Sequence, residues 1–116
     1  MVIAQKSKIS REFLIQAFRE AADAAVAADP GADADGETCN FDRLAVKLPG
    51  IRVKTVMECA TIAEISVDEF IWFGRQWFCI HVPSHGQANR RTVMAQAACR
   101  KLQDFGLKSL LYYQMD

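Results

Sequence analysis

The sequence has no excess of charge of either sign. Its 116 residues contain 14 lysines and arginines and 14 aspartates and glutamates, which gives a formal net charge of zero at pH 7. A chain without a net field is not drawn onto nucleic acid or an anionic membrane by its overall charge. Any charged partner must therefore be recognised by a local group of side chains.

Long apolar runs are also lacking. No stretch approaches the roughly 20 apolar residues that a membrane-spanning helix needs. The first residues, MVIAQKSKISREF, do not contain the apolar stretch of a signal peptide. We therefore expect a cytoplasmic protein without a membrane partner.

Closely spaced cysteine pairs, which are typical of structural zinc sites, are absent. Four single cysteines lie twenty residues apart in unrelated local sequences: Cys39, Cys59, Cys79 and Cys99. The apolar or alternating patterns around most of them predict buried, reduced thiols. We expect no metal and no other cofactor.

Basic residues are missing from residues 20–42, where seven acidic residues occur. A calcium loop needs carboxylates at its first, third and fifth positions and a glutamate at its twelfth. Here Gly31 occupies the first position and Asp42 the twelfth. We therefore predict that residues 29–38 form a hydrated acidic loop that binds no structural calcium.

Hydrophobic periodicity predicts three helices and four strands. The helices are expected within residues 10–28, 52–64 and 85–106, and the strands within residues 41–50, 65–73, 77–83 and 108–115. The second and third strands are expected to form a hairpin that is broken at Gly74-Arg75-Gln76.

When the first helix is set aside, the remaining order is strand, helix, strand, strand, helix, strand, the split βαβ arrangement of ferredoxin-like domains. We predict a single α+β domain with a four-stranded antiparallel sheet and an extra N-terminal helix. It divides into the N-terminal helix (1–28), the acidic loop (29–38) and the βαββαβ core (39–116). The second and fourth strands should lie at the sheet edges.

This topology brings several polar segments to one end of the sheet. The start of the last helix lies there, and Arg90 and Arg91 add donors that suit phosphate or carboxylate. The candidate binding residues at this end are Asn40, Asp42, His85, Gln87, Asn89, Arg90, Arg91, Tyr113, Gln114 and Asp116. The alternative is a structural lock, in which one arginine reaches Asp42 or Asp116.

A second candidate surface is the sheet face opposite the two crossover helices, called the open face below. Alternation places Trp77 and His81 of the third strand and Lys47 of the first strand on it. The first helix is a suitable cover for this face, but the face could instead bind another copy of the chain or a different protein. RNA-recognition modules share the topology and present stacking aromatic residues on the first and third strands. Because the first strand carries no aromatic residue in this phase, nucleic acid is the weaker expectation.

The stretches GETCNFDRLAVKLPG, WFGRQWF, HGQANRRTVMAQAA and LYYQMD resemble a group of small proteins from phages, prophages and bacteria. The resemblance covers about residues 36–116 and brings no activity and no functional residue with it. A phage origin implies a protein that binds and blocks a host machine.

The sequence contains no set of base, nucleophile and orienting group that would indicate an enzyme. We therefore predict a non-catalytic binding protein, with another protein as its partner and a homodimer as one form of that interaction. Two alternatives stay open. One is a small-ligand or phosphate site at the start of the last helix, and the other is an RNA or single-stranded DNA binding module.

Overall fold

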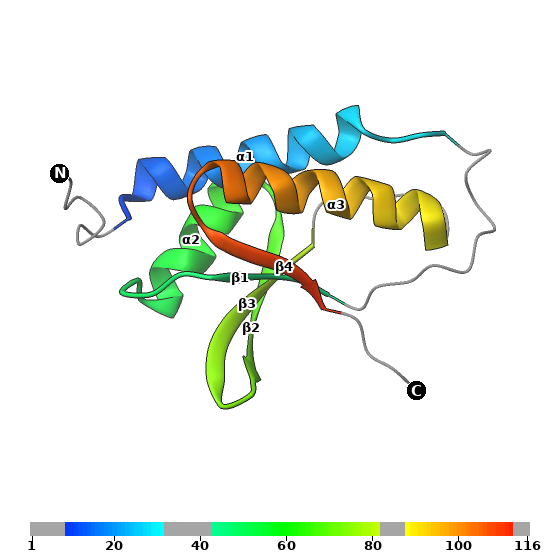
Figure 1. The fold of residues 1–116 in the computed structure, drawn as a ribbon. Coiled ribbons are helices and arrows are strands. Elements are labelled where there is room, and N and C mark those ends of the chain that lie inside the picture. Colours follow the sequence, from blue (N-terminus) through cyan, green and yellow to red (C-terminus); the bar gives the residue numbers. More distant parts are fainter. Residues whose placement is uncertain (1–8, 32–42, 82–87, 113–116) are drawn as a thin grey trace, which may run out of the picture.

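The computed structural model describes residues 9–31, 43–81 and 88–112. Their elements follow the predicted order of one helix and then βαββαβ (Figure 1). They are α1 (Arg11–Ala27), β1 (Arg43–Lys47), α2 (Val53–Ala63), β2 (Ser66–Trp72), β3 (Arg75–His81), α3 (Ala88–Asp104) and β4 (Lys108–Tyr112).

The four strands form one sheet in the order β2-β3-β1-β4, and all neighbours are antiparallel. The first and third strands are therefore central, and the second and fourth lie at the edges, as the sequence predicts. The fold is an α+β domain of the ferredoxin-like, split βαβ kind with an additional N-terminal helix.

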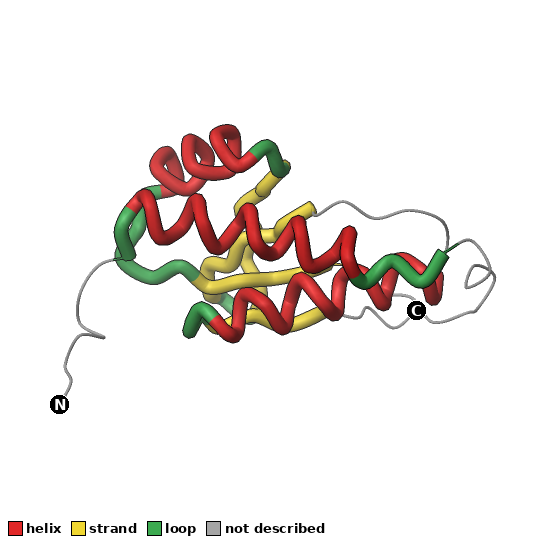
Figure 2. The backbone as a smooth tube through the Cα atoms, turned by 90° about the horizontal axis from the view of Figure 1, so that it is seen from above, coloured by secondary structure: helices red, strands yellow, loops and turns green. Residues whose placement is uncertain are grey.

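All three helices lie on the same face of the sheet, and α1 lies between α2 and α3 (Figure 2). The expectation that the first helix covers the open face is therefore wrong. Its inward stripe combines Leu14 and Phe18 with three alanines, and all five side chains are buried in the main core. Because alanines let helices approach closely, this stripe fits between two neighbours better than over a flat sheet.

Polar contacts fix the start of α1. The Oγ atom of Ser10 accepts a hydrogen bond from the backbone N–H of Phe13 at 3.0 Å, so Ser10 caps the helix as its residue type favours. Arg11 forms an ion pair of 2.7 Å with Glu58 of α2. The Phe13 ring is partly exposed and meets Phe105 edge to face, with ring centroids 5.4 Å apart.

Strand alternation determines which side chains enter the core. The side chains of β1 and β3 that face the helices are Leu44, Val46, Phe78 and Ile80, which alternate with the open-face residues. They pack against α1, α2 and α3 in one continuous apolar cluster. Strand residues of the other phase, Trp77 among them, lie on the open face.

Three of the four cysteines lie in the described part of the chain, and all three are free and buried, as predicted. Burial raises the pKa of Cys59 and of Cys99, because the charged thiolate is poorly solvated there. The Cys99 sulfur also accepts a hydrogen bond from the hydroxyl of Ser109 at 3.4 Å. Cys39 lies outside the described residues.

A two-residue turn, Phe73-Gly74, joins β2 to β3. Both residues have positive φ angles, 55° and 73°, which is the signature of a type I′ turn. The predicted break at residues 74–76 is therefore misplaced, because Arg75 and Gln76 already belong to β3. A type I′ turn matches the right-handed twist of the strands, so pairing continues up to Trp72 and Arg75.

Candidate binding surface

The predicted convergence of chain segments at one end of the sheet is present in the described residues. Arg43 at the start of β1 pairs with Tyr112 at the end of β4. Most candidate side chains of this end lie outside the described residues: Asn40, Asp42, His85, Gln87, Tyr113, Gln114 and Asp116. Asn89 is described only as part of the α3 backbone.

Arg90 is held by a carboxylate. Its Nε and Nη2 atoms donate to the two carboxylate oxygens of Asp29 at 2.7 and 3.0 Å, and the Gly31 N–H donates to the same carboxylate at 2.9 Å. The two side chains are only 18% and 21% exposed. A planar, two-bond pair of this kind is a strong structural contact.

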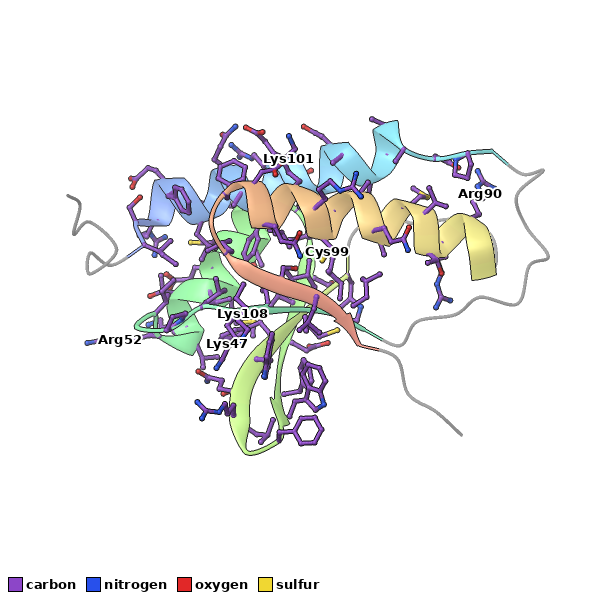
Figure 3. The ribbon with its side chains drawn as sticks, viewed as in Figure 1. Lys47, Arg52, Arg90, Cys99, Lys101 and Lys108 are labelled. Atoms are coloured by element: carbon purple, nitrogen blue, oxygen red, sulfur yellow. The ribbon has the colours of Figure 1, made fainter. Side chains whose placement is uncertain are left out.

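Among the described residues, the carboxylate that binds Arg90 is that of Asp29, whereas Asp42 or Asp116 was expected. The sequence pattern had assigned Asp29 to the hydrated acidic loop. Asp29 follows α1, and α1 runs beside α3, so the end of one helix meets the start of the other at Arg90 (Figure 3). Arg91 is half-buried and also has an interaction within the chain. A phosphate site at the start of α3 would have to displace Asp29 from Arg90.

The open face holds the other predicted group, Lys47, Trp77 and His81, and more residues than the sequence indicated. The strand register places Phe70 and Trp72 of β2 on this face, because Phe70 lies opposite Trp77 and Trp72 opposite Arg75. The sequence pattern alone did not place these residues on the open face, because their side depends on the pairing register of the edge strand β2 with β3. Alternation within ISVDEFIW, together with the hairpin register, could have identified them.

At one end of the open face, His81 lies near a carboxylate and a thiol. Its Nε2 atom is 3.0 Å from Asp68 Oδ2 and 3.7 Å from Cys79 Sγ. A nucleophile relay needs the two ring nitrogens in separate bonds, one to the nucleophile and one to the orienting carboxylate. Because both contacts use the same nitrogen and Cys79 is buried, this trio does not form such a relay.

A groove of about 440 Å³ lies between α2 and the edge strand β2. His81 and Asp68 are its two titratable lining residues, and they pair with each other. The described residues contain no group of three or more histidine, cysteine, aspartate or glutamate side chains that could hold a metal ion.

The opposite end of the open face, toward the β2–β3 turn, combines cations with aromatic rings. The ammonium groups of Lys47 and Lys108 lie 5.4 and 5.8 Å from the ring centroid of Trp77, whose side chain is 6% exposed. The two lysines are direct partners in the register of β1 and β4, and they lie close together in Figure 3. Like charges placed directly opposite each other destabilise a sheet, and cation–π attraction to Trp77 opposes that repulsion with a similar magnitude.

A row of rings runs from the sheet to the turn. The centroid of Trp72 lies 5.2 Å from that of Trp77 and 5.5 Å from that of Phe73. The hairpin extends beyond β1 and β4 (Figure 1), and at its turn Phe73 is 86% exposed. We name this region the hairpin platform; it consists of Lys47, Trp72, Phe73, Arg75, Trp77 and Lys108.

Comparisons with known proteins identify no relative. No family model matches the chain, and neither a curated protein nor a solved structure is significantly similar to it. Among the described helices, none has the length and apolar character required to cross a membrane. The function must therefore be argued from the two surfaces described above.

Proposed function

We propose that this chain is a non-catalytic binding protein and that the hairpin platform is its binding surface. One observation carries the proposal: Phe73 has a positive φ angle of 55° and an 86% exposed side chain. The first position of a type I′ turn favours asparagine, aspartate or glycine, which tolerate positive φ. Phe73 is thus favoured neither by the turn nor by burial.

The backbone conformation of Phe73 has an energetic cost. The left-handed region costs roughly 1–2 kcal/mol for a residue with a side chain such as phenylalanine. Strained residues persist where function requires them, and exposed aromatic side chains are frequent anchors at interfaces. Ile71 beside the turn is 65% exposed, so the end of the hairpin offers further apolar surface.

Two alternatives have less support. A phosphate site at the start of α3 competes with Asp29 for Arg90. A homodimer in which two hairpin platforms face each other would bring the lysines of one copy toward those of the other, since a two-fold interface pairs the same patch with itself. A cytoplasmic location belongs to the proposal as a prediction. The proposal holds for either class of ligand: the protein partner with a phage-type blocking role that the sequence predicts, or nucleic acid, and the nuclease treatment below distinguishes the two.

Capture from a bacterial lysate tests the binding surface. Immobilised parent chain, Phe73→Ala and Ile62→Ala would be compared, with and without nuclease treatment of the lysate. Ile62 is the matched control, because it is an exposed apolar side chain of α2 on the helix side of the sheet. We expect Phe73→Ala to lose captured material that Ile62→Ala retains. If both variants capture the same molecules as the parent, the hairpin platform is not the binding surface.

A further inference from the structure

We infer that the hairpin platform binds single-stranded nucleic acid, with phosphates at Lys47 and Lys108 and bases against the aromatic row. This inference rests on the proposed function, because it names the ligand of the same surface. Three features carry it: an unbalanced group of cations, a row of aromatic rings beside them, and the exposure of the last ring.

The first feature is a group of three cations in the hairpin platform. Lys47 and Lys108 lie directly opposite each other, and in the described part of the chain neither forms an ion pair with a carboxylate. Arg75 adds a third, exposed cation in register with Trp72 on the same face. Asp68, an acidic residue on this face, lies at the other end of β2 beside His81. An anion between the two lysines would turn their mutual repulsion into attraction.

The aromatic row indicates which anion fits. Trp77 is covered and forms the floor beneath the two ammonium groups, whereas Trp72 and Phe73 continue outward to the turn. Single-stranded nucleic acid combines a charged backbone with flat bases that stack on such rings. The acidic side chains of a peptide would neutralise the lysines, but they present no aromatic face to the 86% exposed ring of Phe73, whereas every nucleotide pairs its phosphate with a flat base. A duplex keeps its base faces stacked inside and could offer only phosphates.

The expected affinity is salt-dependent because each neutralised phosphate releases counterions. For single strands, log K falls with log salt concentration by about 0.7 for each phosphate contact, so three cations predict a slope of about −2. Removing one cation should lower the steepness by about 0.7. Removing the Phe73 ring should weaken binding without changing the slope, since a ring neutralises no phosphate.

Fluorescence anisotropy with labelled oligo(U), oligo(dT) and a duplex of equal length would test these points on the full chain. We expect both single strands to bind at least about tenfold more tightly than the duplex. Lys108→Ala and Phe73→Ala should each weaken binding about tenfold, and only Lys108→Ala should lower the salt slope. Lys101→Ala removes the same charge from α3 on the other side of the molecule (Figure 3) and should change neither quantity.

The variants are suited to the test because Lys108→Ala removes both a like-charge repulsion with Lys47 and a cation–π contact with Trp77, so its Tm should stay close to that of the parent. Absence of single-strand binding would overturn the inference, as would equal binding of the duplex, or equal effects of Lys108→Ala and Lys101→Ala. If no oligonucleotide binds but nuclease-resistant capture still depends on Phe73, the platform binds a protein. In that case the inference fails and the proposed function stands.

Discussion

Replacing Phe73 by asparagine should make the fold more stable while removing function. Asparagine is favoured at the first position of a type I′ turn, so the substitution relieves most of the roughly 1–2 kcal/mol that phenylalanine incurs at φ 55°. The loss of the ring contact with Trp72 at 5.5 Å subtracts about 0.5 kcal/mol, since the Phe73 ring is 86% exposed. The net gain is about 1 kcal/mol, or roughly 3–5 °C in Tm for a chain of this size.

The assay is thermal and urea unfolding followed by circular dichroism, with binding measured on the same samples. Phe73→Ala is the first control, because it removes the ring but keeps a side chain with unfavourable energy at positive φ. It should not gain stability. Gly74→Ala is the second control: a Cβ at Gly74 meets no atom within 4 Å, so the strain at φ 73° acts alone. We expect it to lose about 1 kcal/mol.

A Phe73→Asn variant that melts at or below the parent temperature would show that the turn is not strained by Phe73. A variant that is more stable and still binds fully would show that the strain has no relation to function. Either result removes the observation on which the proposed function depends.

Three further predictions concern the rest of the fold. Arg90→Ala should lower the free energy of unfolding by about 2–4 kcal/mol, because it removes two charge-assisted hydrogen bonds from the partly buried carboxylate of Asp29. In urea unfolding, the Arg90→Ala/Asp29→Ala double variant should lose less than the sum of the single variants. Phe18→Ala should lower the free energy of unfolding by about 3–5 kcal/mol, because Phe18 is fully buried in the main core. A chain without α1 should show no cooperative unfolding transition, because the inward stripe of α1 is part of the same core. Cys59 and Cys99 should react slowly with a thiol reagent until urea is added. Because burial raises the pKa of both thiols, their contribution to the free energy of unfolding should be present below about pH 9 and be lost as the pH rises further, which unfolding at a series of alkaline pH values would measure.

Local patterns predicted the elements well because each pattern reports one physical requirement. Alternation placed Trp77 and Lys47 on the open face, and this leaves Leu44, Val46, Phe78 and Ile80 to face the helices, since strand side chains point alternately to the two faces. The order of elements then determined the sheet, because short connections and right-handed crossovers leave few arrangements.

The position of α1 and the partner of Arg90 could not be predicted in the same way. The apolar stripe of α1 indicates that one side of the helix is buried, but it does not indicate which surface covers that side. The pairing of Arg90 with Asp29 joins residues 61 positions apart and follows directly from that docking. The hairpin platform was predicted only in part. Alternation within a single strand is enough to place Trp77 and Lys47 on the open face, whereas Lys108 and Trp72 are placed there only by the register between strands.

The place of α1 between α2 and α3 also determines the order in which the protein can be completed during synthesis. During synthesis α1 leaves the ribosome before α3, its main neighbour, and before Arg90, which pairs with Asp29 just after α1. Until then the stripe of Leu14, Phe18 and the alanines has no complete binding groove. An alanine-rich helix is well suited to the period before α3 is synthesised, because alanine favours the helix and exposes little apolar area that could cause misfolding or aggregation. Closure of the helix layer around α1 should therefore be a late, cooperative step, formed largely from contacts distant in sequence.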